Sequence, residues 1–217
     1  MILSIITFIL VGLTFWNGIR FFLDEPKLFK QIYFDKLKDY FWAFLLFLGT
    51  ITTLSLLSMV ELPSFLKFSW IKLLGGTGTN LIANPGLTEG PSTFAFIGTI
   101  IFYLCLIAIL PYLAKMEEIS FRSQRFSVKD RVISSIKFGF IHMIVGVPVF
   151  AAILLCFIGY IFSIRYKRAF YKHYEQSYSY DKCEEEAIDS ATSLHAKFNF
   201  IIISLLLITI SILHFAK

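Results

Sequence analysis

Six polar residues could do chemistry in a chain that is otherwise mostly apolar: Glu117, Glu118, Arg122, His142, His195 and Asn199. Their spacing is helical, because Glu118 and Arg122 are four residues apart, as are His195 and Asn199, and His142 follows Phe138 by the same step. Residues four apart share one face of a helix. Ionisable groups in or beside a membrane span are costly when unpaired, so these positions are candidates for a functional site.

The residue types predict a site that activates water. A carboxylate beside an imidazole in a partly dry pocket can take a proton from water, and the resulting hydroxide can attack a peptide carbonyl. The oxyanion then needs fixed hydrogen-bond donors, which a His and an Asn one helical turn apart can supply. Arg122 would orient one glutamate and leave the other free as the base.

Two other interpretations of the same residues stay open. A set of Glu, His and His can bind a divalent metal with an open position for water. We rank the metal below a metal-free mechanism and predict no cofactor, because the chain lacks HExxH and Asn is a poor zinc ligand. The polar residues could also be interfacial ion pairs and hydrogen bonds between helices, as in a catalytically silent membrane scaffold or accessory subunit.

Composition points to the membrane as the place where these residues act. The 217 residues are 57% hydrophobic, 18% aromatic and only 16% charged, with a mean hydropathy of +0.72, which lies outside the range of soluble domains. Apolar runs extend along the whole chain. We therefore expect one integral membrane domain over residues 1–217, with spans and interfacial helices in 1–92 and the candidate catalytic helices in 93–217.

The apolar runs predict an all-α, polytopic transmembrane bundle with about six crossings. The run at residues 132–164 is too long for one span and contains Gly146-Val147-Pro148, so we split it into a short helical hairpin. Residues 21–40 and 65–74 are expected at the membrane interface, 75–91 in a loop, and 165–193 in a polar helix-loop insertion. The other four spans are expected at residues 2–19, 41–60, 93–114 and 194–215.

Basic residues predict the orientation. With both termini outside, 17 of the 20 Lys and Arg residues fall in regions that face the cytoplasm, as the positive-inside rule requires. The candidate residues then lie near the cytoplasmic leaflet. The net charge of +5 is explained by these short loops, so we expect no nucleic-acid partner; the predicted partners are the bilayer and a membrane-associated protein or peptide substrate.

The three polar motifs, in this order, resemble those of a known family. Residues 117–122 are similar to EExxxR, residues 138–142 to FxxxH, and residues 195–199 to HxxxN, the motifs of the CAAX protease and bacteriocin-processing enzymes. These intramembrane glutamate proteases include the Ras-converting type II CAAX endopeptidases. The resemblance covers roughly residues 110–203, and Gly159, Tyr160 and Arg165 also fit it. Ser123 stands where glycine is frequent, and the 165–193 insertion is longer than expected.

The resemblance implies roles for the six residues. Glu117 and Glu118 with His142 would activate water, and His195 with Asn199 would stabilise the oxyanion. Members cleave prenylated proteins near the C-terminus in eukaryotes or act on peptides and membrane proteins in bacteria. The short, phenylalanine- and lysine-rich chain favours a bacterial plasma membrane, and hence a substrate without a prenyl group.

Overall fold

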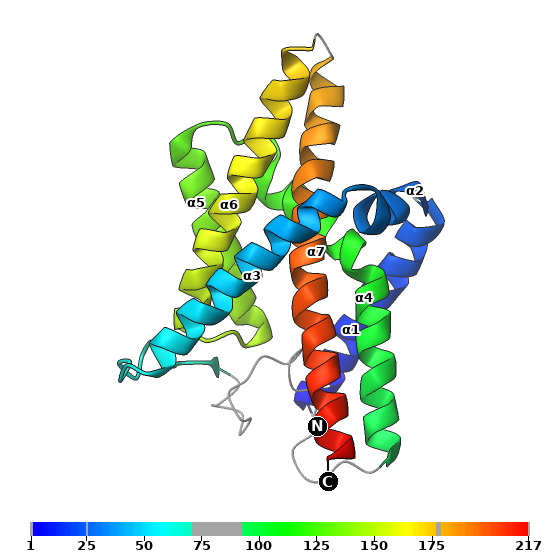
Figure 1. The fold of residues 1–217 in the computed structure, drawn as a ribbon, viewed down its shortest axis with the longest axis vertical. Helices are drawn as coiled ribbons and strands as arrows, with labels where there is room; N and C mark the ends of the chain where they lie inside the picture. Colours follow the sequence, from blue (N-terminus) through cyan, green and yellow to red (C-terminus); the bar gives the residue numbers. More distant parts are fainter. Residues whose placement is uncertain (1, 25, 71–92, 177–178, 217) are drawn as a thin grey trace.

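The computed structural model describes residues 2–24, 26–70, 93–176 and 179–216. Every regular element in these ranges is helical (Figure 1). The loop predicted at residues 75–91 and the end of the interfacial stretch 65–74 lie outside the described residues. The elements are α1 (Ile2–Asp24), α2 (Pro26–Lys30), a π-helical turn (Gln31–Asp35), α3 (Leu37–Ser58), α4 (Thr93–Arg122), α5 (Val128–Ile141), a 3-10 turn (His142–Val145), α6 (Val149–Tyr174) and α7 (Tyr180–Phe215).

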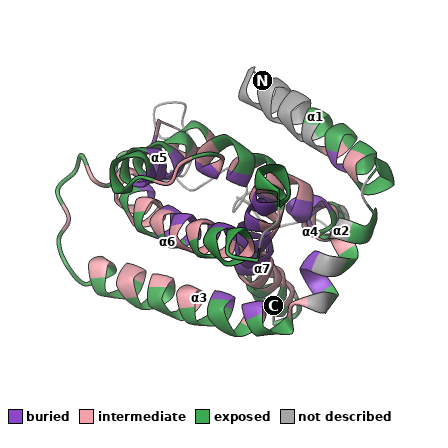
Figure 2. Cartoon of the chain, turned by 90° about the horizontal axis from the view of Figure 1, so that it is seen from above, coloured by how far each residue is buried: buried purple, intermediate pink, exposed green. Residues whose placement is uncertain are grey.

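Four helices in the described ranges are long and apolar enough to cross a membrane: Leu37–Ser58, Phe96–Arg122, Val149–Tyr174 and Tyr180–Phe215. Many of their large apolar side chains are exposed, as in lipid-facing helices, and Figure 2 shows exposed residues along the outer faces of these helices. The described part of the chain is therefore all-helical, and its long apolar helices are those of a membrane protein.

The break predicted at Gly146-Val147-Pro148 is confirmed. Gly146 adopts a left-handed conformation with φ of 90° after the 3-10 turn, a geometry in which a side chain would be strained. Pro148 stands at the N-cap of α6 with φ of −63°, where its missing N–H costs nothing. The chain thus reverses here, and α5 packs along α6 as a hairpin.

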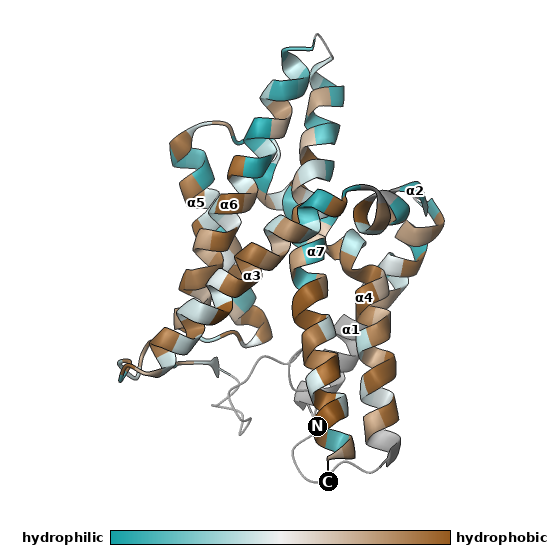
Figure 3. Ribbon diagram, viewed as in Figure 1, coloured by the Kyte–Doolittle hydropathy of each residue, from teal (hydrophilic) through white to brown (hydrophobic). Residues whose placement is uncertain are grey.

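Three helices extend well beyond the predicted spans, and one of them is α6, which continues past residue 164 to Tyr174. α4 continues past residue 114 to Arg122, and α7 begins at Tyr180 rather than at residue 194. With ~1.5 Å rise per residue, the 36 residues of α7 reach about 54 Å, well beyond a hydrocarbon core of ~30 Å. Figure 3 shows hydrophilic residues gathered at the upper ends of α6 and α7, above their apolar portions.

The polar extension is a helical hairpin with a small core of its own. Tyr166, Phe170, Cys183, Ala187 and Ala191 are buried together between the end of α6 and the start of α7. Composition predicted the solvated character of this segment, but its apolar positions recur at helical spacing, which keeps both helices intact beyond the membrane.

A proline inside α4 is compensated from the N-terminal region. Pro111 has no N–H to donate to the carbonyl of Ile107, and the hydroxyl of Tyr33 donates to that oxygen instead, at 2.7 Å. Burial raises the pKa of Tyr33 above its ordinary value, so the phenol stays protonated and can donate. The π-helical turn is thereby fixed against α4.

The bundle core lies where α3, α5, α6 and α7 meet. Phe138 of α5, Ile158 and Phe162 of α6, and Leu194 and Phe198 of α7 are buried in one cluster with Ala43 of α3. α3 crosses α7 obliquely (Figure 1). This cluster surrounds the polar residues described next.

Candidate functional site

The end of α4 supplies a buried ion pair. Glu118 and Arg122 are 0% and 1% exposed, and Arg122 Nε lies 3.4 Å from Glu118 Oε2. The guanidinium also lies 4.7 Å from the centroid of the Phe138 ring, a favourable cation-π geometry. Its NH1 donates to the carbonyl of Phe121 at 3.3 Å. Arg122 therefore neutralises and orients Glu118 within the bundle.

His195 of α7 contacts the other oxygen of Glu118. Nδ1 of His195 lies 2.9 Å from Glu118 Oε1. The imidazole stacks on Phe162 with ring centroids 4.5 Å apart. The ring of Phe138 forms a T-shaped contact with the imidazole, with ring centroids 5.6 Å apart. Both carboxylate oxygens of Glu118 are thus engaged, and the ring of His195 is held by aromatic neighbours on two sides.

Glu117 has a different environment from that of Glu118. Its side chain is 35% exposed, and its Oε2 lies 3.9 Å from His142 Nε2 and 3.7 Å from His195 Nε2. That oxygen is itself buried and has no direct hydrogen bond within the described residues. Separations of this size are too long for direct hydrogen bonds and suit a bridging water.

The orientation of His142 fixes which of its nitrogens can face water. Nδ1 lies 2.7 Å from the carbonyl oxygen of Phe138. Because a carbonyl can only accept, Nδ1 carries the hydrogen, and in the neutral imidazole Nε2 keeps a lone pair. The lone pair of Nε2 is on the side of Glu117.

Asn199 lies one helical turn after His195 on the same face of α7. Its side chain is half-buried, and it makes no hydrogen bond to the described residues. The structure therefore brings Glu117, Glu118, Arg122, His142 and His195 into one connected group, and Asn199 lies one helical turn from the His195 member of that group.

A glycine allows this packing. A Cβ on Gly159 of α6 would lie 2.6 Å from Cδ1 of Phe138 and 3.2 Å from NH2 of Arg122. Real Cβ atoms do not approach ring carbons so closely, so only glycine lets α6 pack against Phe138 without displacing it. Phe138 in turn contacts Arg122 and His195 and supplies the carbonyl that orients His142.

The segment from Leu66 to Trp70 closes the α5–α6 hairpin. Trp70 Nε1 donates to the carbonyl of Met143 at 2.7 Å, and Ser69 Oγ donates to that of Gly146 at 2.8 Å. The first N–H groups of α6 bond to carbonyls of the same segment: Val149 N to Phe68 O at 3.2 Å and Phe150 N to Leu66 O at 3.0 Å. Helix-end groups are thus satisfied next to His142.

A second polar network joins α3 to α6 and α7, and the sequence did not predict it. Arg165 NH2 donates to Asp39 Oδ1 at 2.8 Å, and Ser193 Oγ donates to Asp39 Oδ2 at the same distance. Buried Lys197 bonds to Ser193 at 3.1 Å and to the carbonyl of Lys36 at 2.7 Å. The available signal was an acidic residue, Asp39, at the start of an apolar span.

Metal ligation has no ready geometry in the described part of the chain. There, no group of three His, Cys, Asp or Glu side chains is arranged to hold a metal ion.

Comparison with known proteins gives no relative: no family model, curated protein or solved structure matches this chain.

Proposed function

We propose that the chain is an intramembrane endopeptidase of the CAAX protease type, which hydrolyses a peptide bond of a membrane-associated protein or peptide with water activated by Glu117. One observation carries this proposal. Glu117 presents an oxygen to two imidazole Nε2 atoms, at 3.9 and 3.7 Å, whereas the neighbouring Glu118 is engaged by Arg122 and His195. The two adjacent glutamates thus have different roles, base for Glu117 and positioning residue for Glu118.

In the first step a water molecule bridges Glu117 Oε2 and His142 Nε2 through its two hydrogens, at ordinary lengths of about 2.8 Å. Its oxygen attacks the carbonyl carbon as Glu117 takes one proton, and the carbonyl π electrons move onto oxygen. When the tetrahedral intermediate collapses, the C–N bond breaks and Glu117 returns the proton to the leaving amine. The same carboxylate is then ready for another turnover.

His195 and Asn199 stabilise the oxyanion in this proposal. Because Nδ1 of His195 faces a carboxylate oxygen of Glu118, one proton lies between the two groups. A second proton on Nε2 makes that atom a donor, and the Asn199 amide one turn away is another. Arg122 beside Glu118 balances the carboxylate charge. Donors held on a rigid helix need no reorganisation as the negative charge develops.

The proposed topology has about six crossings, with both termini outside and the site open to the cytoplasm. α5 and the 3-10 turn that follows it have 14 and 4 residues, which reach about 29 Å at rises of ~1.5 and ~2.0 Å per residue. That is close to a hydrocarbon core of ~30 Å, so the hairpin is long enough to supply two crossings. The charge bias supports this orientation in a bacterial plasma membrane.

A silent scaffold is the main alternative, since buried Glu118, Arg122 and His195 could serve packing alone. Glu117 argues against it, because its partly exposed side chain holds a carboxylate oxygen near two imidazole nitrogens without a direct hydrogen bond in the described residues, whereas a group used only for packing would be paired directly. A metal-dependent hydrolase is the other alternative. Full activity in the presence of a strong chelator would exclude it.

The test compares Glu117→Gln with Glu118→Gln in a bacterial host that expresses the full chain. Endoproteolysis creates new protein N-termini, which chemical labelling and mass spectrometry detect without a known substrate. We expect new N-termini in the wild type, their loss by roughly 10²- to 10⁴-fold in Glu117→Gln because the base is gone, and a partial loss in Glu118→Gln. A wild-type pattern in Glu117→Gln would contradict the proposal.

A further inference from the structure

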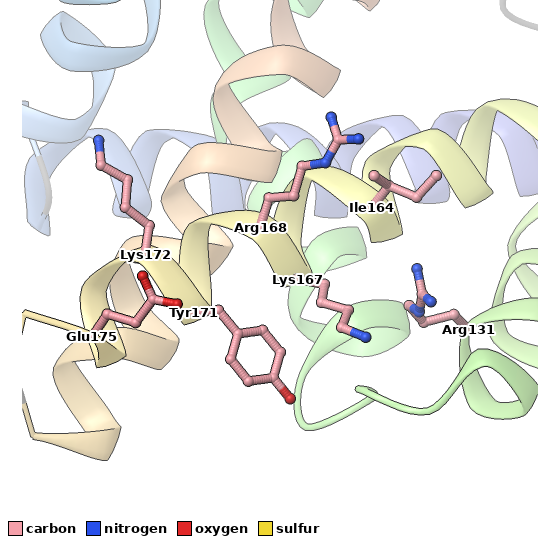
Figure 4. A pocket seen from close by; sticks show the side chains of 7 residues that line it. All are labelled: Arg131, Ile164, Lys167, Arg168, Tyr171, Lys172 and Glu175. Carbon is pink, nitrogen blue, oxygen red and sulfur yellow. The ribbon is translucent and has the colours of Figure 1, made fainter.

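A basic hollow lies at the surface between the N-terminal part of α5 and the C-terminal half of α6, apart from the candidate site. Its volume is about 460 Å³, and Figure 4 shows the side chains that line it. Four of these are cations and one is a carboxylate, so the hollow attracts anions. They are Arg131, Lys167, Arg168, Lys172 and Glu175.

Arg131 is the unusual member of this set. It is 7% exposed, and its Nε is buried without a hydrogen-bond partner in the described part of the chain. Its guanidinium lies 5.4 Å from the centroid of the Tyr160 ring, and the ion pairs of the described residues do not include it. A buried cation with an unsatisfied donor is costly unless an anion completes its environment.

Lys167 faces the same space from α6. In Figure 4 its ammonium end points toward Arg131, while Arg168 and Lys172 leave α6 on the other flank. Lys167 also lies 5.6 Å from the centroid of the Tyr171 ring, which holds its stem beside the hollow. Arg131 and Lys167 therefore form the pair that a bound anion would meet.

The hollow sits at the level where the membrane surface is expected. α6 is apolar up to Ile164, which also lines the hollow, and becomes basic from Arg165 onward. Apolar and basic groups next to each other at the end of a span match a lipid molecule, whose acyl chains lie in the core and whose phosphate lies at the surface.

We propose that this hollow binds the phosphate group of an anionic phospholipid, with Arg131 and Lys167 as the two principal contacts and the chains of the lipid alongside Ile164. The guanidinium suits a phosphate because it can donate two parallel hydrogen bonds. Phosphate chemistry alone would also admit free phosphate, but the position at the membrane surface commits the site to a lipid. The proposal goes beyond proteolysis and does not depend on it.

The experiment titrates the purified full chain in detergent micelles with phosphatidylglycerol, phosphatidylcholine of the same acyl chains, or inorganic phosphate, and counts bound molecules by native mass spectrometry. A basic residue near an anionic lipid contributes enough for about a fivefold change in affinity. We expect Lys167→Gln to weaken phosphatidylglycerol binding about fivefold, and Arg131→Gln with Lys167→Gln to weaken it about 25-fold.

The matched control is Lys129→Gln with Lys137→Gln, which removes the same charge from exposed positions of α5 outside the hollow. It should leave binding unchanged. Equal losses in both double variants would overturn the site in favour of diffuse surface charge. Equal binding of phosphatidylcholine would overturn the preference for an anionic lipid. Inorganic phosphate that stays bound to the chain, or that displaces phosphatidylglycerol at millimolar concentration, would assign the hollow to free phosphate. Lys167 is half-buried, so its single variant tests the site even if the double variant misfolds.

Discussion

Replacing Gly159 by alanine perturbs the candidate site without replacing any of its polar side chains, although the new Cβ would also lie 3.2 Å from Nη2 of Arg122. The new Cβ would lie 2.6 Å from Phe138 Cδ1, about 1 Å closer than the ~3.5–4.0 Å of favourable carbon contacts. The ring must move by about that amount or α6 must shift. Overpacking of this kind costs roughly 1–3 kcal/mol in the free energy of unfolding.

The displaced ring is the one on which the site depends. The centroid of the Phe138 ring lies 4.7 Å from the guanidinium carbon of Arg122 and 5.6 Å from the centroid of the His195 ring. The backbone carbonyl of Phe138 orients His142. A displacement of about 1 Å in catalytic groups costs on the order of 10²-fold in rate. We therefore expect Gly159→Ala to lower kcat by about that factor, with a smaller effect on KM.

The assay combines thermal unfolding in detergent micelles, followed by tryptophan fluorescence, with the rate at which new N-termini appear. Gly98→Ala is the matched control, because a Cβ at Gly98 of α4 would have no atom within 4 Å. The control should keep wild-type activity, and its free energy of unfolding should rise by up to about 1 kcal/mol, since alanine lowers the entropy of the unfolded chain. Unchanged stability and rate in Gly159→Ala would refute the close packing on Phe138.

Two further changes test the supports of the bundle, and one treatment tests the metal alternative. Tyr33→Phe should lower the free energy of unfolding by about 1–3 kcal/mol, because it leaves the carbonyl of Ile107 without a donor. The control Tyr112→Phe should have little effect, and equal losses of stability in the two variants would refute the role of Tyr33. Asp39→Ala should lower the free energy of unfolding by about 1–3 kcal/mol, because Arg165 and Ser193 lose the carboxylate to which they donate. A double variant with Arg165→Met should recover part of the loss, which a double-mutant cycle measures. Proteolysis should continue at its full rate after prolonged chelation, and activity restored only by added zinc would show a metal mechanism.

Local sequence signals were sufficient for the hairpin and for the grouping of polar residues by face. Gly146 and Pro148 each have a backbone preference that ends a helix, so the break could be located from their identities. The i, i+4 pairs placed Glu118 with Arg122 and His195 with Asn199 on shared faces. These inferences depend only on helix geometry, which is the same in any tertiary context.

The contacts between helices could not be predicted in the same way. The pairing of Asp39 with Arg165 joins residues 126 positions apart, and no periodicity within either helix encodes which helices become neighbours. The different environments of Glu117 and Glu118 follow from the rotation of α4 relative to α5 and α7. The predicted spans fall short of the observed ends of α4 and α6 and of the observed start of α7, because hydropathy marks where a span ends and not where a helix ends.

Hydrolysis in water enriched in ¹⁸O tests the central claim most directly. Purified wild-type chain in proteoliposomes is incubated with a solubilised bacterial membrane-protein fraction, and mass spectrometry follows the C-termini that cleavage creates. We expect ¹⁸O in these new C-termini for the wild type, a near absence of new C-termini in Glu117→Gln, and an intermediate yield in Glu118→Gln. New C-termini formed equally well by wild type and Glu117→Gln would contradict the assignment of Glu117 as the base.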